Sequence, residues 1–100
     1  MLFINKQQTA IFEKWFAKLP SNVKEKIAEY IDRVLHGNTS CCEPVGEGIT
    51  EIKINYQKGY RVYYTVINGR TVLLLLCGGD KKSQPGDIKN AKKIKRMLEA

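Results

Sequence analysis

This sequence contains little of what enzymes and membrane proteins commonly use. Its 100 residues include one histidine, three cysteines and one tryptophan. No apolar stretch approaches the ~18 residues of a membrane-spanning helix, and the first residues, MLFINKQQ, lack the basic and then apolar layout of a secretory signal. We therefore expect a cytoplasmic protein without a membrane partner. The length is typical of one domain and predicts a single domain over residues 1–100.

The few potential metal ligands are poorly spaced. Cys41 and Cys42 are adjacent, Cys77 stands alone, and the single histidine, His36, lies five residues before the pair. Adjacent cysteines do not have the C-x-x-C spacing that zinc prefers, and a fourth ligand is missing. The odd number of cysteines also gives no simple disulfide framework. We expect no metal site and no cofactor, and interpret the cysteine pair as a reduced loop.

Positive charge, in contrast, is abundant. Lysine and arginine together number 17 against 10 acidic residues, which gives a net charge of +7. Residues 80–100 alone hold seven basic and three acidic residues, a net charge of +4. Such asymmetry predicts a polyanionic partner, most often nucleic acid, or an acidic protein that masks the surface. A merely solvated basic helix is the alternative that charge alone leaves open.

Apolar residues at helical spacing predict two helices separated at Pro20. The expected inward positions are Ile11, Phe12, Trp15, Phe16 and Leu19 in the first helix, and Val23, Ile27, Tyr30, Ile31, Val34 and Leu35 in the second. Gly37-Asn38 supplies a stop signal for the second helix. The short apolar run at residues 2–4 is a candidate first strand, and the two helices are expected to form an antiparallel hairpin.

After a predicted loop over residues 39–48, the apolar period changes to two. Residues 49–56 and 59–66 are typical of strands, Asn68-Gly69 of a tight hairpin turn, and residues 70–77 of the return strand. That last strand is apolar on both faces, so we expect it to be central and covered twice. A final helix is expected to turn Ile88, Ala91, Ile94 and Leu98 inward, with Pro85 and Asp87 in its first turn. The order β-α-α-β-β-β-α predicts an α+β fold, an antiparallel sheet packed on a helix hairpin.

The turns set an expected strand register. A turn centred on Gln57-Lys58 places Lys53 opposite Tyr63, and the Asn68-Gly69 turn places Arg61 opposite Leu76. In this register Ile52, Ile54, Val62 and Tyr64 face the helix pair, and Glu51, Lys53, Arg61 and Tyr63 share the opposite face. Lys81 and Lys82 leave the last strand beside Arg61, where Gly78-Gly79 is expected to let the chain turn sharply.

Such a cluster of cations is a plausible receptor for phosphates. Like charges on neighbouring strands repel each other, so the cluster does not serve stability. Arg61 offers a planar fork for bidentate contacts, the lysines offer point charges, and Tyr63 offers a ring for stacking on a base. The alternative for each residue taken singly is a solvated sheet face with scattered charges.

The residues of this site are compatible with few types of reaction. No Ser-His-Asp set, paired carboxylates, phosphate-binding loop or metal motif occurs in the sequence, which argues against an activated serine or cysteine nucleophile and against a metal-dependent nuclease. What remains is metal-free cleavage of RNA, in which the substrate's own 2′-hydroxyl attacks the adjacent phosphate. The protein then needs only to stabilise the phosphate, position the chain and assist proton transfer.

Three stretches, GNTSCCEPVGEGITEIKI, GYRVYY and LLLLCGGDKKSQPGDIKNAKKI, closely resemble the HigB-like, phage Gp49-type branch of the RelE/ParE toxin superfamily. These are the "addiction module killer" toxins of bacterial type II toxin–antitoxin systems. The resemblance covers essentially the whole chain, from FEKWFAKL to the final helix. It implies a RelE-like fold and ribosome-dependent cleavage of mRNA that stops translation. It also implies neutralisation by a cognate antitoxin of the HigA type, which often carries a helix-turn-helix domain for operator DNA.

The resemblance also implies roles for particular residues. Lys53 and Arg61 match basic sheet positions associated with catalysis in RelE-like toxins, and Lys81 matches the loop lysine of this branch. Lys82 and Gln84 are implied RNA contacts. The final helix, with AKKIKRMLEA at its end, lacks the tyrosine that some RelE relatives place there, so Tyr63 is the remaining candidate for that role.

The sequence leaves two other functions open. A ParE-like toxin would poison DNA gyrase without chemistry of its own, and ParE relatives share the fold but lack the basic catalytic cluster. A decayed toxin would only bind its antitoxin and operator DNA. Lys53, Arg61 and Lys81 in one register favour the endoribonuclease.

Overall fold

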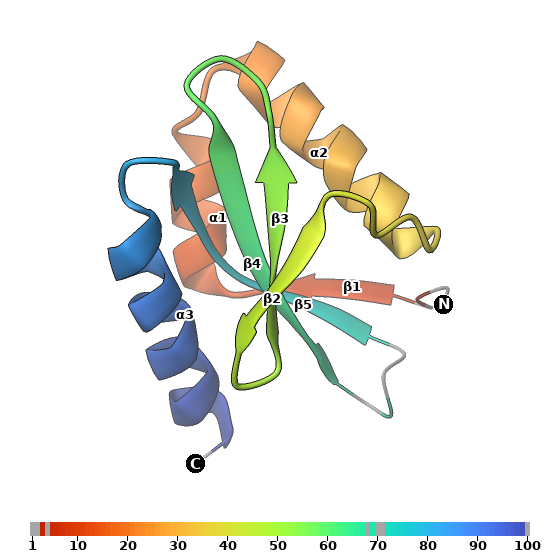
Figure 1. Cartoon of the computed structure of the whole chain (residues 1–100), viewed down its shortest axis with the longest axis vertical. Helices are drawn as coiled ribbons and strands as arrows, with labels where there is room; N and C mark the ends of the chain where they lie inside the picture. The colour runs from red at the N-terminus through yellow and green to blue at the C-terminus, as the bar shows by residue number, and fades with distance from the viewer. Residues whose placement is uncertain (1–2, 4, 68, 70–71, 100) are drawn as a thin grey trace.

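The computed structural model describes residues 3, 5–67, 69 and 72–99. Its elements are β1 (Asn5–Gln8), α1 (Ala10–Ala17), α2 (Ser21–Leu35), β2 (Cys42–Gly46), β3 (Ile49–Ile54), β4 (Tyr60–Ile67), β5 (Val72–Asp80) and α3 (Gln84–Glu99). Five strands form one sheet in the order β1-β5-β4-β3-β2 (Figure 1). The α+β class and the succession of helices and strands are confirmed, with one further strand. The helices found in the described residues are all too short or too polar to cross a membrane.

One face of the sheet packs on α1 and α2. Phe12 from α1 and four residues of α2, Val23, Ile27, Ile31 and Val34, are buried against Ile52, Ile54, Tyr60, Val62, Tyr64, Leu73 and Leu75 from the strands. Trp15, Phe16, Leu19, Tyr30 and Leu35 pack around this cluster. These are the inward positions predicted from helical spacing. Ile11 is the exception, with 53% of its surface exposed.

The opposite face is covered by α3. Ala91 and Ile94 of this helix are buried against Ile49, Tyr63, Leu76 and Cys77. The return strand β5 is therefore apolar on both faces because α1 and α2 cover one side and α3 the other (Figure 1). The prediction that Leu98 faces inward is wrong, since 57% of its surface is exposed.

The two edge strands were located imperfectly from the sequence. Residues 2 and 4 of the predicted first strand lie outside the described residues, and the observed β1 at Asn5–Gln8 pairs in parallel with Val72–Leu75 of β5. The predicted loop over residues 39–48 contains β2, which pairs antiparallel with β3. Pro44 cannot donate to a ladder and Gly46 disrupts the register, which explains why this edge strand has no readable pattern.

The register differs from the predicted one, but the faces do not. Lys53 pairs with Arg61 rather than with Tyr63, and Glu51 pairs with Tyr63. This is a shift of two residues, which keeps every side chain on its predicted face. The ladder between β4 and β5 is also shifted, with Ile67 opposite Val72, and a bulge between Tyr63 and Tyr64 adds one residue. Arg61 therefore lies opposite Gly79, and its predicted pairing with Leu76 is wrong. The Asn68-Gly69 turn lies partly outside the described residues.

The glycine pair does not turn the chain, contrary to the prediction. Gly78 and Gly79 lie inside β5, paired with Val62 and Arg61. A Cβ atom on Gly78 would lie 2.2 Å from Cζ3 of Trp15, and one on Gly79 would lie 1.8 Å from Oδ2 of Asp87. Glycine is therefore required because α1 and α3 press against the two faces of the same strand. The chain turns only after Asp80.

Candidate nucleic-acid site

Arg61 is the centre of the candidate site, at the end of the sheet that carries the β3–β4 turn. Only 7% of its surface is exposed. Its Nη1 donates to the carbonyl oxygen of Tyr60 over 3.4 Å, while its buried Nε has no partner among the described residues. A guanidinium stays charged and is costly to bury without a carboxylate. Arg61 is therefore a buried cation with unused capacity to bind an anion.

Lys53 lies directly beside Arg61, as their pairing across β3 and β4 requires. Cα atoms of directly paired residues are about 4.5–5.5 Å apart, so the two cations are neighbours on one face. The ammonium group of Lys53 forms an ion pair with Glu43 of β2. This pair holds the pKa of Glu43 below its ordinary value, chiefly through the hydrogen bond from Lys53. Lys53 also lines a shallow hollow of about 280 Å³ with Cys41, Cys42 and Asn55 among others.

Lys81 and Lys82 lie on the turn that follows β5. The backbone N–H of Lys81 donates to the carbonyl of Gly59 in the β3–β4 turn over 3.1 Å. Lys58, Asp80 and both lysines line a hollow of about 500 Å³. Lys58 and Asp80 form an ion pair of 3.4 Å, while Lys81 and Lys82 have no carboxylate partner among the described side chains.

A short hydrogen-bond chain holds this turn in place. The backbone N–H of Ser83 donates to Oδ1 of Asp80 over 3.0 Å, and this bond is the main reason that the pKa of Asp80 lies below its ordinary value. The hydroxyl of Ser83 donates to Asp87 in the first turn of α3. Burial raises the pKa of Asp87. The position of Lys81 and Lys82 is therefore tied to the start of α3.

Tyr63 cannot stack on a base, contrary to the prediction, and the half-buried Gln84 is engaged in a hydrogen bond to the sheet. Tyr63 is completely buried, and burial raises the pKa of its phenol far above the ordinary value. Its hydroxyl donates to Oε2 of Glu51 over 3.0 Å. Nε2 of Gln84 donates to the same oxygen over 2.7 Å, which fixes the start of α3 on the sheet. A buried ring offers no face to a base, so Tyr63 leaves the candidate site and does not replace the tyrosine missing from α3.

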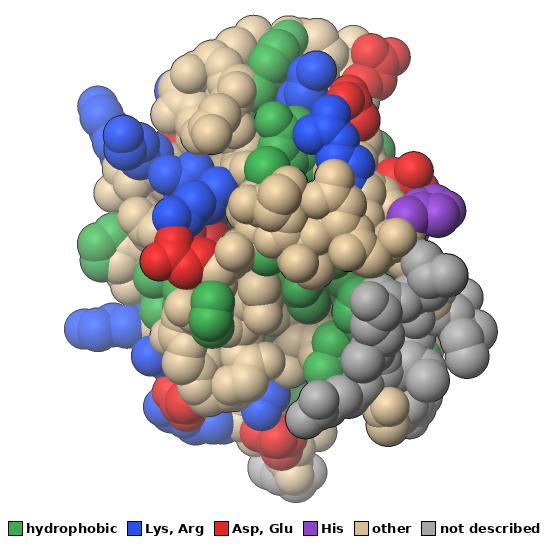
Figure 2. Space-filling model, turned by 45° about the vertical axis from the view of Figure 1, so that its right-hand side comes forward, with side chains coloured by type: hydrophobic (Ala, Val, Ile, Leu, Met, Phe, Trp, Pro, Cys, Tyr) green, Lys and Arg blue, Asp and Glu red, His purple; other side chains and the backbone are tan. Residues whose placement is uncertain are grey.

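We call Lys53, Lys58, Arg61, Lys81 and Lys82 the cation cluster. The structure places Arg61 between β3, which carries Lys53, and the end of β5, which leads to Lys81. Lys53 and Lys81 line separate hollows on the two sides of Arg61. Figure 2 shows basic side chains in several small groups on one face, some beside acidic ones, rather than as one continuous patch. Because Lys53 and Lys81 line different hollows, the cluster suits several phosphates along a chain better than one compact ligand.

Sequence reasoning missed Glu43 and Lys58 as neighbours of the site. Glu43 lies on β2, which had no readable strand pattern, and Lys58 lies in the β3–β4 turn. A signal for Lys58 was present, because a turn centred on Gln57-Lys58 must lie at the same sheet end as Arg61. No group of three histidine, cysteine or carboxylate side chains in the described part of the chain lies close enough together to hold a metal ion.

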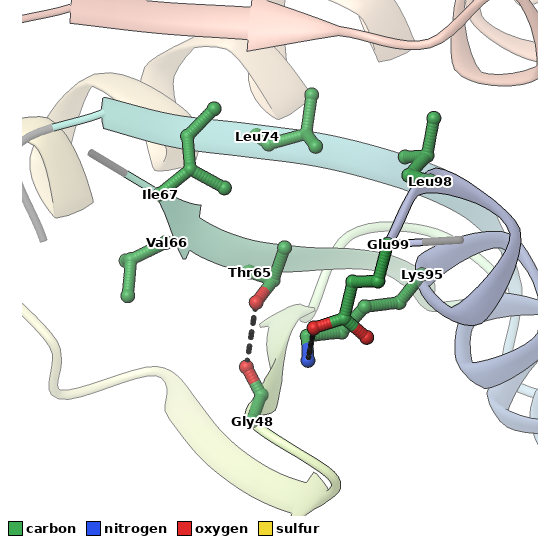
Figure 3. A pocket seen from close by; sticks show the side chains of 8 residues that line it. All are labelled: Gly48, Thr65, Val66, Ile67, Leu74, Lys95, Leu98 and Glu99. Carbon is green, nitrogen blue, oxygen red and sulfur yellow. Dashed lines mark hydrogen bonds and ion pairs between the residues drawn. The ribbon is translucent and has the colours of Figure 1, made fainter. Parts of the chain in front are cut away.

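A further hollow lies at the other end of β4 and is unlike the cation cluster. It has a volume of about 280 Å³ and includes Ile67, Leu74 and Leu98 in its lining. Figure 3 shows two polar contacts at its rim, from the Thr65 hydroxyl to the Gly48 carbonyl at 2.9 Å and between Lys95 and Glu99 at 3.2 Å. Its lysine is already paired, so this hollow offers no comparable anion site.

The fold defines the class of the protein. The structure is similar to the E. coli RelE toxin in its intact RelBE complex, with a TM-score of 0.67, 24% identity, and coverage of 80% of this chain and 96% of that chain. A mutant of E. coli RelE in the free state matches with a TM-score of 0.74, 22% identity, and coverage of 93% and 97%. The toxin–antitoxin complex RelBE2 of Mycobacterium tuberculosis matches with a TM-score of 0.64, 16% identity, and coverage of 81% and 94%. The chain therefore has the RelE fold.

Sequence comparison gives the family. Residues 14–99 match the model of the phage-derived protein Gp49-like family. An uncharacterised protein of Haemophilus influenzae is 42% identical over 91 residues, covering 90% of this chain and 91% of the relative. The chain belongs to the Gp49-like family, as its sequence motifs predicted.

Proposed function

We propose that this protein is the toxin of a type II toxin–antitoxin system, of the HigB-like kind, and that it cleaves mRNA on the ribosome without a metal ion. The observation that carries the proposal is the buried guanidinium of Arg61, whose Nε has no partner among the described residues. Lys53 flanks it on β3, and Lys81 and Lys82 follow the end of β5. Membership of the Gp49-like family and the RelE fold support the same function.

The proposed reaction uses the RNA's own nucleophile. The 2′-oxygen attacks the adjacent phosphorus, the bond from phosphorus to the 5′-oxygen breaks, and a proton passes from the 2′-oxygen to the leaving 5′-oxygen. The products are a 2′,3′-cyclic phosphate and a 5′-hydroxyl end. Arg61 stabilises the extra negative charge on the pentavalent phosphate, and its fork suits two oxygens at once. Lys81 and Lys53 neutralise the same charge from either side, and Lys82 holds a neighbouring phosphate.

The proposed partners follow from the proposed activity as a ribosome-dependent toxin. The mRNA in a ribosome is the substrate, and a cognate antitoxin, which we expect to carry a HigA-like helix-turn-helix domain, neutralises the toxin and recruits it to operator DNA. The solved relatives include RelE toxins in complex with their antitoxins. The place of action would be the cytoplasm, where ribosomes and mRNA meet.

The test compares three single variants. Arg61→Met keeps a long side chain but removes the charge, Lys81→Met does the same in the turn, and Arg33→Met is the control on the exposed surface of α2, where Arg33 pairs with Glu29. Removing one donor to a transition-state oxyanion costs about 10²–10³ in rate. We expect ribosome-bound mRNA to be cut by the wild type and by Arg33→Met, and cutting to fall at least a hundredfold in the other two variants.

The same experiment separates this function from gyrase poisoning. Induction of the wild-type protein alone should stop translation, with mRNA ends mapped inside codons on ribosomes. Intact mRNA together with accumulated cleaved DNA–gyrase complexes would refute the endoribonuclease in favour of a ParE-like toxin. Undiminished mRNA cleavage by both Arg61→Met and Lys81→Met would show that the reaction takes place elsewhere on the protein.

A further inference from the structure

A groove separate from the cation cluster lies between α1 and α3, which flank β5 on its two faces (Figure 1). It has a volume of about 490 Å³. Its apolar lining comes from Ile11 and Trp15 of α1, Cys77 and Gly78 of β5, and Ile94 and Met97 of α3. None of these residues belongs to the cation cluster, so the groove needs its own explanation.

The rim of the groove carries unusually exposed apolar side chains. Ile11 is 53% exposed and Met97 is 67% exposed. These two residues sit on different helices and line the same groove. Single exposed apolar side chains are common, whereas a pair that converges on a hollow with an apolar floor marks a surface that a partner covers. Met97 is also flexible enough to adapt its shape to an incoming side chain.

The floor of the groove is an open edge of the sheet. β1 pairs with β5 only as far as Leu75, and Thr9 then caps this edge through bonds to the carbonyls of Leu75 and Leu76. Within the described residues, no strand lies beside β5 from Cys77 onward on this side. An unpaired strand edge favours a polypeptide as occupant, because another chain brings both backbone groups and side chains.

Charge around the groove restricts the partner further. Lys93 lines it, and Lys89 lies one helical turn earlier on α3. Lys14 of α1 and Lys18, the residue that caps its C-terminus, lie three residues after Ile11 and Trp15. All four lysines are exposed, and none forms an ion pair with a described carboxylate. The lining contributes one acidic group, Asp87, which already accepts a hydrogen bond from Ser83. A polypeptide segment rich in acidic residues complements the positive charge of these lysines.

We infer that the groove between α1 and α3 is the docking site for an acidic polypeptide segment that inserts apolar side chains between Ile11, Trp15 and Met97. Resting on the proposed function, we assign this segment to the antitoxin. Because the groove and the cation cluster have different residues, antitoxin binding and RNA cleavage respond to different substitutions. RNA is the less suitable occupant, since the floor is apolar and phosphates find no arginine in the lining.

The test measures binding of the purified product of the open reading frame that adjoins this gene, by titration calorimetry. Ile11→Glu and Met97→Glu place a charge in the groove at exposed positions where folding tolerates it. Leu98→Glu is the matched control, because Leu98 is 57% exposed on the same helix but lines the other hollow. We expect the dissociation constant to rise at least tenfold in the two groove variants and to stay within twofold in the control.

Further variants distinguish docking in the groove from mRNA cleavage at the cation cluster. Lys93→Glu should slow association, with a smaller effect at high salt, and it leaves the apolar lining intact. Binding is measured without RNA, so it stands even if the protein proves not to cleave mRNA. The proposal is overturned if the adjoining gene product does not bind the wild type or binds the groove variants equally well. It is also overturned if Arg61→Met and Lys81→Met weaken that binding instead, or if Ile11→Glu and Met97→Glu weaken binding of a labelled RNA oligonucleotide.

Discussion

Replacing Gly78 by alanine should destabilise the protein through one identifiable contact. The added Cβ would lie 2.2 Å from Cζ3 of Trp15 and 2.5 Å from two further atoms of the same ring. Carbon atoms in contact are normally about 3.5–4.0 Å apart, so the ring or the strand must move by more than 1 Å. The backbone at Gly78 has no positive φ angle, so the cost comes from crowding and not from backbone strain.

The size of the effect follows from this crowding. Overpacking typically costs 1–3 kcal/mol, and a middle value of about 2 kcal/mol corresponds to a fall in Tm of roughly 8–16 °C for a domain of this size. Thermal unfolding followed by circular dichroism measures this shift. In a Trp15→Ala background the ring is gone, and most of the cost of Gly78→Ala should disappear. The double-mutant cycle should therefore give a coupling of about 1–3 kcal/mol.

The control is Gly86→Ala. Gly86 lies in the first turn of α3, where an added Cβ meets nothing within 4 Å and no positive φ is found. Alanine at a helical position is favoured over glycine by about 0.5–1 kcal/mol, so this variant should be at least as stable as the wild type. An equal loss of stability from Gly78→Ala with and without Trp15 would refute the reasoning, because the ring would then not be the cause.

Three further substitutions test the polar contacts near the site. Tyr63→Phe should cost about 1–3 kcal/mol by removing a donor to the buried Glu51, and should leave the Kd for single-stranded RNA unchanged, whereas base stacking by Tyr63 would weaken it. Asp80→Asn should lower Tm at pH 7, because the pKa of Asp80 lies below its ordinary 3.8 in the folded state; the difference should shrink as pH falls through that lowered value, and a constant difference would contradict this cause. Glu43→Gln should strengthen binding of an RNA oligonucleotide at low salt by releasing Lys53 from its ion pair, and unchanged affinity would remove Lys53 from the interface.

The two faces of the sheet could be predicted from the sequence because the face of a strand residue depends only on whether its position is odd or even. The alternation in β3 and β4 placed Ile52 and Val62 on one face and Lys53 and Arg61 on the other, as observed. An error of two residues in the register left these assignments intact. An error of one residue would have inverted them. The faces were therefore predicted correctly even though the exact strand pairs were not.

What the sequence did not reveal depends on contacts between distant elements. Tyr63 and Glu51 read as surface residues because their own strands alternate, and only the position of α3 over that face buries them. Gly78 and Gly79 read as a turn because glycine in a short pattern commonly marks one. Glycine is required there because Trp15 packs against Gly78 and Asp87 against Gly79. Trp15 is far from β5 in the sequence and Asp87 lies beyond a turn, so no local pattern predicts these contacts.

The position of α3 also explains why the site lies at one end of the sheet. The helix starts at Gln84, fixed to Glu51 by a hydrogen bond of 2.7 Å, and covers the face from Tyr63 onward. Arg61 lies two residues before Tyr63 on β4, so it falls at the margin of this cover. There it is buried enough to lose most of its hydration yet keeps an unsatisfied Nε. A charge held in such a place contributes little to stability, since an apolar residue of similar volume is often neutral or stabilising there. Its position at the margin of the cover therefore supports the anion binding that we propose for Arg61.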